Sequence, residues 1–352
     1  MAAFLLAIIG TLAVRRWALK VGFVDKPGER KIHAAPIALG GGIVIFWLTI
    51  FPLAAAGIMG VLFFHYGTPA WVPPALATHV PGLASRRAML TCLVVAAALL
   101  HLTGLRDDKR ALGPGVKLLV QLAAALLVTT AGGVRLSFFI PNPVVTTLLS
   151  ILWIMVITNA FNFLDNMDGL SAGVAAICSA VILSAALASG QVFVGGLLCL
   201  LMGSLAGFLI FNFHPAKIFM GDSGSLIVGF LLAVATMQTT YYQHNDEGTW
   251  YATLMPLIVL AVPLYDFLSV TLIRLSQGRS PFVGDKQHFS HRLMNRGMTQ
   301  RQAVGTIYLA TAGTGLGATI LHQVQASGVV LVFVQTVLIV LIMAILERPE
   351  KK

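Results

Sequence analysis

The chain is organised around the stretch Asn159-Ala-Phe-Asn-Phe-Leu-Asp-Asn-Met-Asp-Gly-Leu170, which joins two apolar runs, residues 144–158 and 171–187. Polar side chains recur in it at every third position: Asn159, Asn162, Asp165 and Asp168. On a regular helix three residues fall about 60° short of a full turn, so the last three can share one side. Asn159 leaves that side unless the helix unwinds there. Carboxylates at the end of a membrane helix are usually functional, whereas a helix cap needs only one Asp or Asn, so the pattern favours a functional site.

The composition is that of a membrane protein. Of the 352 residues, 57% are hydrophobic and 10% are charged, whereas a soluble domain carries about 25% charged residues. A backbone in lipid must satisfy its own hydrogen bonds, so the long apolar runs are expected to be helices. We predict an all-α, polytopic membrane helical bundle, a single integral-membrane domain over residues 1–352 in contact with the lipid bilayer. The net charge of +10 fits loops facing anionic lipid or phosphate better than nucleic acid.

Eleven apolar segments are expected to cross the membrane. They are residues 2–14, 42–63, 88–105, 116–130, 144–159, 170–188, 191–211, 224–241, 250–275, 303–321 and 328–346. The first and fourth are short, so the expected count is about 10 or 11 transmembrane helices. With the N-terminus outside, the cytoplasmic side holds every Lys and Arg except Arg86, Arg87 and Arg135, as the positive-inside rule requires. The predicted cytoplasmic loops are residues 15–41, 105–116, 159–170, 212–223 and 276–302.

Five aspartates fall on that same predicted side: Asp107, Asp108, Asp165, Asp168 and Asp222. The assignment of spans did not require this, so it predicts one active site on the cytoplasmic face of the inner membrane. The adjacent Asp107 and Asp108 cannot both ionise cheaply without a nearby cation. Mg²⁺ prefers one or two carboxylates together with substrate phosphates. A solvated polar loop stays the alternative for this pair.

A second motif, His-Pro-Ala-Lys-Ile-Phe-Met-Gly-Asp-Ser-Gly-Ser at residues 214–225, leads into a predicted span. Gly221 and Gly224 allow close backbone approach, and a helix N-terminus is a natural phosphate site. Asp222 is therefore a candidate metal carboxylate beside a phosphate cradle, with a simple helix cap as the alternative. Phe219 is a candidate to stack on a flat base, with a membrane anchor as the alternative.

Basic and histidine side chains gather in two other loops. Residues 284–294 contain His288, His291 and Arg292, and residues 25–33 contain Arg30 and His33. Two His three apart lack the further ligands of a zinc site, whereas Arg matches phosphate oxygens in a bidentate way. We interpret these residues as phosphate-binding, with inner-leaflet lipid contact as the alternative. Asp266, inside a predicted span, is a further candidate or an acid that only tunes its helix.

Together these segments resemble the polyprenyl-phosphate N-acetylhexosamine-1-phosphate transferases, a glycosyltransferase family 4 superfamily that includes MraY and WecA/TagO types. The matching segments follow the family order: residues 25–33 with Gly40-Gly41, Asp107-Asp108, and residues 159–170, 219–225 and 285–293. The last segment resembles the WecA/TagO form, because it lacks the three consecutive His of MraY. Two positions depart from the resembled pattern: Ser290 stands where many WecA relatives have His, and Asn166 where Gly is usual. Asn tolerates left-handed backbone angles, so the turn can survive.

The resemblance implies transfer of N-acetylhexosamine 1-phosphate, most simply GlcNAc 1-phosphate, from a UDP-N-acetylhexosamine to undecaprenyl (polyprenyl) phosphate, with release of UMP. This would be the first membrane step of a cell-envelope polysaccharide pathway, with Mg²⁺ or Mn²⁺ as cofactor. It implies a metal at Asp222, with Asp107 or Asp108 as a further ligand, and catalytic roles for Asp107, Asp108, Asp165, Asp168 and His291. It implies substrate contacts from Asn162, Phe219, Lys117, His288, Arg292, Arg30 and His33. Within these sets, Asp107 would orient or deprotonate the lipid phosphate, Phe219 would stack on uracil, Asp168 would contact the base, and Lys117 and His291 would neutralise phosphates.

Three other interpretations are weighed against this one. An MraY-type phospho-MurNAc-pentapeptide transferase would differ only in its donor. A cation-coupled transporter would place its acids near the bilayer midplane on broken helices, whereas the key acids here map to helix ends on one side. A non-catalytic lipid-carrier-binding protein would not need the whole set of aspartates. The sugar nucleotide, the polyprenyl length, the pathway and the oligomeric state, a homodimer included, stay open.

Overall fold

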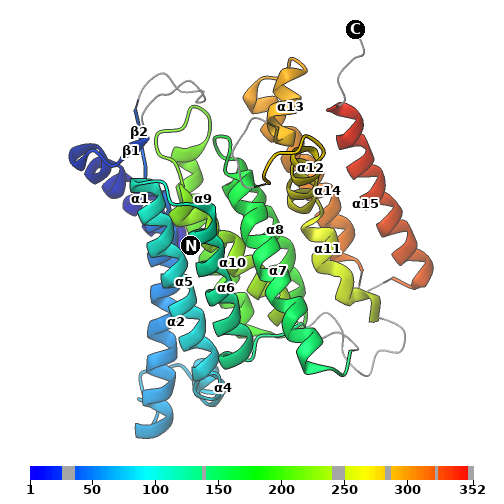
Figure 1. The fold of residues 1–352 in the computed structure, drawn as a ribbon. Coiled ribbons are helices and arrows are strands. Elements are labelled where there is room, and N and C mark those ends of the chain that lie inside the picture. Colours follow the sequence, from blue (N-terminus) through cyan, green and yellow to red (C-terminus); the bar gives the residue numbers. More distant parts are fainter. Residues whose placement is uncertain (26–35, 137–139, 240–249, 282–286, 322–323, 348–352) are drawn as a thin grey trace.

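The computed structural model describes residues 1–25, 36–136, 140–239, 250–281, 287–321 and 324–347 (Figure 1). Its long helices are α1 (Ala2–Val21), α2 (Gly41–Tyr66), α5 (Arg87–Lys109), α6 (Pro114–Leu126), α7 (Pro143–Leu164), α8 (Leu170–Ala188), α9 (Val192–Asn212), α10 (Asp222–Gln238), α12 (Ala261–Ser276), α14 (Gln300–Thr319) and α15 (Ala326–Leu346). Its short ones are α3 (Pro74–Ala77), α4 (Val80–Ser85), η1 (Leu127–Ala131), η2 (Trp250–Leu254), α11 (Met255–Val259) and α13 (Phe289–Asn295). The predicted helical bundle is confirmed, with one addition, an antiparallel hairpin of β1 (Val24–Asp25) and β2 (Ile37–Ala38).

Each of the eleven predicted spans coincides with helical structure. Eight helices of the described chain are long and apolar enough to cross a membrane, and the count is nine if Tyr251–Val259 and Ala261–Ser276, which are bent by 62° relative to each other, form one span. Helix α10 is apolar but only 17 residues long. Helix α14 is not among the eight, because its first turn is polar and it is rich in Gly and Thr. The chain is therefore a multi-pass membrane protein.

Helix α10 lies at the centre of the bundle, in contact with α2, α5, α7 and α8 (Figure 1). Every residue from Ser223 to Met237 is buried. Two glycines allow the neighbouring helices to come this close. A Cβ at Gly104 of α5 would lie 2.4 Å from the Ser223 backbone, and one at Gly42 of α2 would lie 2.3 Å from the Gly224 nitrogen. Side chains at these positions would push α5 and α2 away from the N-terminus of α10.

Three of the predicted loops are shorter than expected because the helices continue into them, and the first of these helices is α1, which runs to Val21. Helix α5 runs to Lys109 and α7 runs to Leu164, without unwinding at Asn159. The Asn159 Nδ2 donates to Gln121 Oε1 of α6 at 2.6 Å, and Gln121 Nε2 donates back to Asn159 Oδ1 at 3.3 Å. This reciprocal amide pair satisfies two polar side chains inside the bundle. Asn159 therefore links α7 to α6, whereas the three-residue pattern predicted only that it would leave the side shared by the other three polar residues.

Candidate active site

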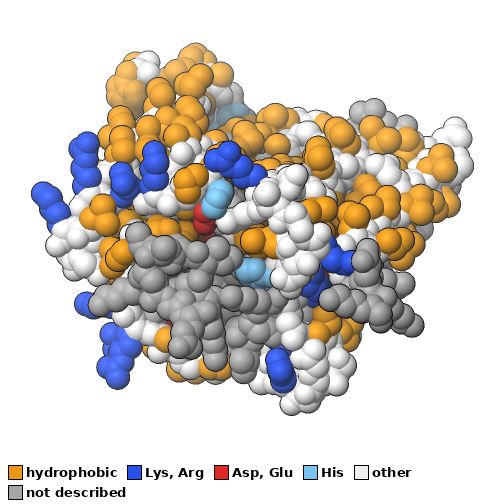
Figure 2. Space-filling view, turned by 90° about the horizontal axis from the view of Figure 1, so that it is seen from above, with side chains coloured by type: hydrophobic (Ala, Val, Ile, Leu, Met, Phe, Trp, Pro, Cys, Tyr) orange, Lys and Arg blue, Asp and Glu red, His pale blue; other side chains and the backbone are white. Residues whose placement is uncertain are grey.

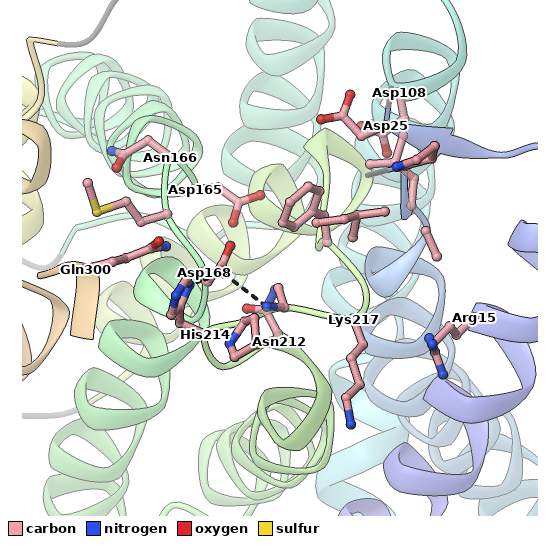
Figure 3. Close-up of a pocket in the computed structure, with 18 of the residues that line it drawn as sticks. Arg15, Asp25, Asp108, Asp165, Asn166, Asp168, Asn212, His214, Lys217 and Gln300 are labelled. Carbon is pink, nitrogen blue, oxygen red and sulfur yellow. Dashed lines mark hydrogen bonds and ion pairs between the residues drawn. The ribbon is translucent and has the colours of Figure 1, made fainter. Parts of the chain in front are cut away.

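A cavity of about 860 Å³ lies at the end of the bundle that carries β1, β2 and α13. Four of the five predicted aspartates line it, together with Phe219 and His291: Asp107, Asp108, Asp165 and Asp168. In Figure 3, Asp165 and Asp168 approach from one side and Asp108 from the other. Figure 2 looks onto this end and shows Lys and Arg side chains around a centre where Asp and His atoms are visible. The volume suits a small-molecule ligand.

The carboxylate of Asp108 caps the N-terminus of α10. Asp222 N donates to its Oδ1 at 2.8 Å, and Ser223 N donates to its Oδ2 at 3.2 Å. The preceding residue, Gly221, has a φ of 72°, and a Cβ there would lie 2.5 Å from Asp108 Oδ2. Partial positive charge at the helix end stabilises the carboxylate. The helix end predicted as a phosphate cradle is thus occupied by a side chain of the chain itself.

The carboxylate of Asp222 is held by two side chains from other helices. Asn162 Nδ2 of α7 donates to its Oδ1 at 3.0 Å, and Lys117 Nζ of α6 donates to its Oδ2 at 2.8 Å. The same ammonium donates to Asp107 Oδ2 at 3.3 Å. Asn162 Nδ2 also lies 2.9 Å from Ser225 Oγ, to which it donates. Asn162, Lys117 and Asp107 thus meet around Asp222.

The turn between α7 and α8 carries the other two aspartates. Asp168 Oδ2 accepts from Ala216 N at 3.0 Å and lies 2.8 Å from His214 Nδ1 (Figure 3). Removal from water raises the pKa of the Asp165 carboxyl well above its usual range, and the negative charges of Asp222 and Asp108 raise it further. The left-handed residue of this turn is Gly169, with a φ of 74°. No residue other than Gly has a positive φ in the described chain. Asn166 is therefore not left-handed, contrary to the expectation.

Phe219 is fixed by its backbone. Phe219 N donates to Ala38 O at 2.9 Å, and Gly41 N donates to Phe219 O at 3.0 Å. These bonds extend β2, which forms a parallel bridge to Ile218. The aromatic side chain lines the cavity on this rigid support. It is therefore placed to offer a flat surface to a bound ligand.

The three residues predicted from the later basic loop face different ways. His291 lines the cavity. The His288 ring is buried, with Nδ1 2.9 Å from Asp266 Oδ2. Arg292 instead donates to Glu347 Oε2, from Nε at 3.0 Å and from Nη2 at 2.8 Å. Asp266 and Glu347 thus hold the side chains that were expected at phosphate, while Arg30 and His33 lie outside the described residues.

The aspartate cluster can be tested for its fit to a metal ion. Within the described residues, no group of three or more His, Cys, Asp and Glu is arranged to hold one. Yet Asp222 and Asp107 both bind the Lys117 ammonium, so a cation already sits between these two carboxylates. A magnesium ion typically uses one or two carboxylates and completes its shell with water and substrate oxygens. The donor set fits such an ion and does not fit a site made of protein ligands alone.

Several cavity residues were not predicted from sequence. They are Arg15, Asn166, Asn212, His214, Lys217 and Gln300. Asn212 ties the site together, because its Oδ1 accepts from Gly169 N at 3.0 Å and its Nδ2 donates to Ile218 O at 2.9 Å. Lys217 and His214 lie in the motif of residues 214–225, and Arg15 lies in α1. Their polar character was a signal, but their direction depends on contacts distant in sequence.

Comparisons with known proteins all indicate the same family. A sequence model described as glycosyl transferase family 4 matches residues 90–240. The probable undecaprenyl-phosphate N-acetylglucosaminyl 1-phosphate transferase of Bacillus subtilis is 33% identical over 316 residues, covering 87% of this chain and 79% of the relative. The decaprenyl-phosphate N-acetylglucosaminephosphotransferase of Mycobacterium tuberculosis is 32% identical, covering 90% and 80%. The undecaprenyl-phosphate alpha-N-acetylglucosaminyl 1-phosphate transferase of Yersinia pestis is 29% identical, covering 88% and 80%.

Proposed function

The chain belongs to glycosyl transferase family 4, and on that premise we propose that it transfers N-acetylglucosamine 1-phosphate from UDP-GlcNAc to a polyprenyl phosphate and releases UMP. It is therefore a phosphotransferase of the WecA/TagO type. The relatives' names support both the sugar and the lipid acceptor. One structural observation carries the proposal. The aspartates of α5 and of the α7–α8 turn line one cavity at a single end of the bundle, and Asp222 of α10 is joined to Asp107 beside them through Lys117.

The reaction brings two anions together. An oxygen of the lipid phosphate attacks the phosphorus that bears the sugar, a new P–O–P bond forms, and the bond to the UMP oxygen breaks. The lipid phosphate is already anionic near neutral pH, so a strong base is not essential. The barrier lies in the repulsion between the anions and in the charge that develops on UMP. Cationic side chains at fixed positions reduce the repulsion between the anions and stabilise the charge that develops on UMP.

The described residues divide this work by position. Lys117 is held between Asp107 and Asp222, where its ammonium can face an incoming phosphate. Asp107 lines the cavity beside it and is assigned to orient the lipid phosphate or accept its proton. Phe219 offers its ring to uracil, and Asp168 faces the base. His291 and Lys217 line the cavity as neutralising groups for the diphosphate.

We infer that Mg²⁺ or Mn²⁺ binds Asp222 together with Asp107, the two carboxylates that share Lys117. When bound, such an ion neutralises phosphate oxygens and stabilises the charge on the leaving UMP. Both oxygens of Asp108 accept backbone N–H groups of Asp222 and Ser223, so in this structure its side chain fixes the start of α10. The donor chemistry supports this assignment, because hard oxygen ligands suit these cations.

The site is proposed to face the cytoplasm from a multi-pass protein of the inner membrane, with the N-terminus outside. The basic residues support this orientation. That topology assigns all Lys and Arg except Arg86, Arg87 and Arg135 to the cytoplasmic side. The donor UDP-sugar would then reach the cavity from the cytoplasm, and the lipid phosphate from the inner leaflet.

A donor panel tests the proposed function. Purified protein is mixed with undecaprenyl phosphate, Mg²⁺ and either UDP-GlcNAc, UDP-GalNAc or UDP-MurNAc-pentapeptide, and UMP release is measured. The proposal expects UMP from UDP-GlcNAc, and only when the lipid phosphate is present. Turnover of the pentapeptide donor alone would assign the chain to the MraY type. Absence of UMP release with every donor would refute transferase activity.

A further inference from the structure

Helix α13, which brings His291 to the cavity, is anchored by two acids. Asp266 of α12 lies 2.9 Å from His288 Nδ1, and its Oδ1 accepts from Phe289 N at 2.7 Å. Glu347, which follows α15, accepts from Arg292 and also from Tyr265 Oη at 2.7 Å. Buried or half-buried charge-assisted bonds of this kind hold an element firmly. Helix α13 is thus fixed to α12 and to the end of α15.

Helix α13 is also tied to the turn that carries the aspartates. Ser290 is buried, and its hydroxyl donates to Asn166 Oδ1 at 2.6 Å. The amide of Asn166 uses its other end within its own turn, where Nδ2 donates to Phe163 O at 2.6 Å. Asn166 lies between Asp165 and Asp168 and lines the cavity (Figure 3). The amide therefore bridges the turn and the helix.

These contacts form one continuous series of bonded residues across the site. On one end stand Asp165 and Asp168, which flank Asn166 in the turn. On the other end stands His291, the residue after Ser290. Because α13 is anchored to α12 and to the end of α15, the Ser290–Asn166 bond joins a fixed helix that carries His291 to the turn that carries the aspartates. Ser290 and Asn166 are also the two positions that depart from the resembled family pattern, and here they contact each other.

We propose that Ser290 and Asn166 are a positioning pair, whose hydrogen bond holds His291 of α13 in register with Asp165 and Asp168. Neither residue is assigned to the chemistry; each acts through its neighbours. This inference rests on the proposed phosphotransferase activity for its kinetic consequences. The link itself is a structural statement and has its own readout.

A double-mutant cycle tests the pair. Ser290→Ala and Asn166→Ala each remove the bond, and Asn166 has no left-handed backbone that alanine would strain. A neutral hydrogen bond contributes roughly 0.5–1.5 kcal/mol, which converts to a fall in kcat of about two- to thirteenfold for each variant. The KM for UDP-GlcNAc should change by less than about twofold, because positioning acts on the transition state. The double variant should lose no more than the larger of the two single losses, because Asn166→Ala also removes the bond to Phe163 O.

Two further variants keep the test specific. Ser290→Thr retains the hydroxyl and should restore kcat to within about twofold of the wild type. Ser276→Ala removes an exposed hydroxyl at the end of α12, which donates to Ile273 O in its own helix, and serves as the matched control with unchanged kcat. Losses that multiply in the double variant, failure of Ser290→Thr to rescue, or an equal loss in Ser276→Ala would each overturn the proposal.

Hydrogen exchange separates this inference from the proposed function. In Asn166→Ala, backbone amides of α13 should exchange faster, and in Ser290→Ala those of residues 165–169 should do so, at an unchanged unfolding temperature. That result stands whether or not UDP-GlcNAc is the donor. Unchanged exchange in both segments would remove the link, even if the wild type releases UMP. Absence of UMP release from the wild type would refute the transferase proposal alone.

Discussion

Replacement of Asp222 by Asn changes one atom at the point where three helices meet. Asp222 Oδ2 accepts from Lys117 Nζ at 2.8 Å, and Oδ1 accepts from Asn162 Nδ2 at 3.0 Å. Both partners are donors, so the amide nitrogen that the substitution introduces would face one of them whichever way the side chain turns. A charge-assisted hydrogen bond contributes about 1.5–3 kcal/mol, and this variant also loses the charge of a proposed metal ligand. A loss of about 3 kcal/mol in the transition state lowers kcat by roughly 150-fold.

The assay is UMP release from UDP-GlcNAc at saturating lipid phosphate, over a titration of Mg²⁺. Asp222→Asn should show at least about a hundredfold lower turnover, and no Mg²⁺ concentration should restore it. The unfolding temperature of the solubilised variant is the control, because the wild-type carboxylate also supports packing at the start of α10. Near-normal, Mg²⁺-dependent turnover would remove Asp222 as a metal ligand and refute the assignment.

Three other substitutions test separate parts of the account. Phe219→Ala should raise the KM for UDP-GlcNAc by about tenfold, the cost of about 1–1.5 kcal/mol of stacking, and more than the KM for lipid phosphate; equal effects would exclude a uracil platform. A cysteine introduced as Gln287→Cys should react with an impermeant thiol reagent only from the cytoplasm, with the unmodified chain as blank, and labelling from outside intact cells would reverse the topology. Gly104→Ala should lower the unfolding temperature, because its Cβ would lie 2.4 Å from the Ser223 backbone and overpacking costs about 1–3 kcal/mol. Gly113→Ala is the matched control, since a Cβ there meets nothing within 4 Å, and equal stability of both variants would contradict the close approach of α5 to α10.

The helices and the aspartate cluster were predictable from the sequence for simple physical reasons. Apolar length determines which segments can span a bilayer, and every predicted segment coincides with helical structure in the described residues. The alternation of spans across the membrane, oriented by the positive-inside rule, then predicts that Asp107, Asp165 and Asp222 lie on one side. The three-residue rhythm also separated Asn162, which bonds Asp222, from Asn159, which pairs with Gln121.

The directions of the side chains on α13 were not predictable. His288, His291 and Arg292 share a short basic segment, and nothing local distinguishes them. The direction of His288 depends on Asp266, 22 residues away in the sequence, and that of Arg292 depends on Glu347, 55 residues away. Likewise, the capping of α10 by Asp108 joins residues 114 apart. Long-range acid partners of this kind leave no periodic signal in the sequence.

The most direct test of the central claim follows the phosphorus. UDP-GlcNAc labelled with ³²P at the sugar-bearing phosphate is incubated with undecaprenyl phosphate, Mg²⁺ and purified protein, and the lipid and aqueous phases are separated. Transfer of N-acetylglucosamine 1-phosphate predicts that the label moves into the lipid while unlabelled UMP stays in the aqueous phase. Label that remains in the aqueous phase, as UDP or as the unreacted donor, would contradict the account.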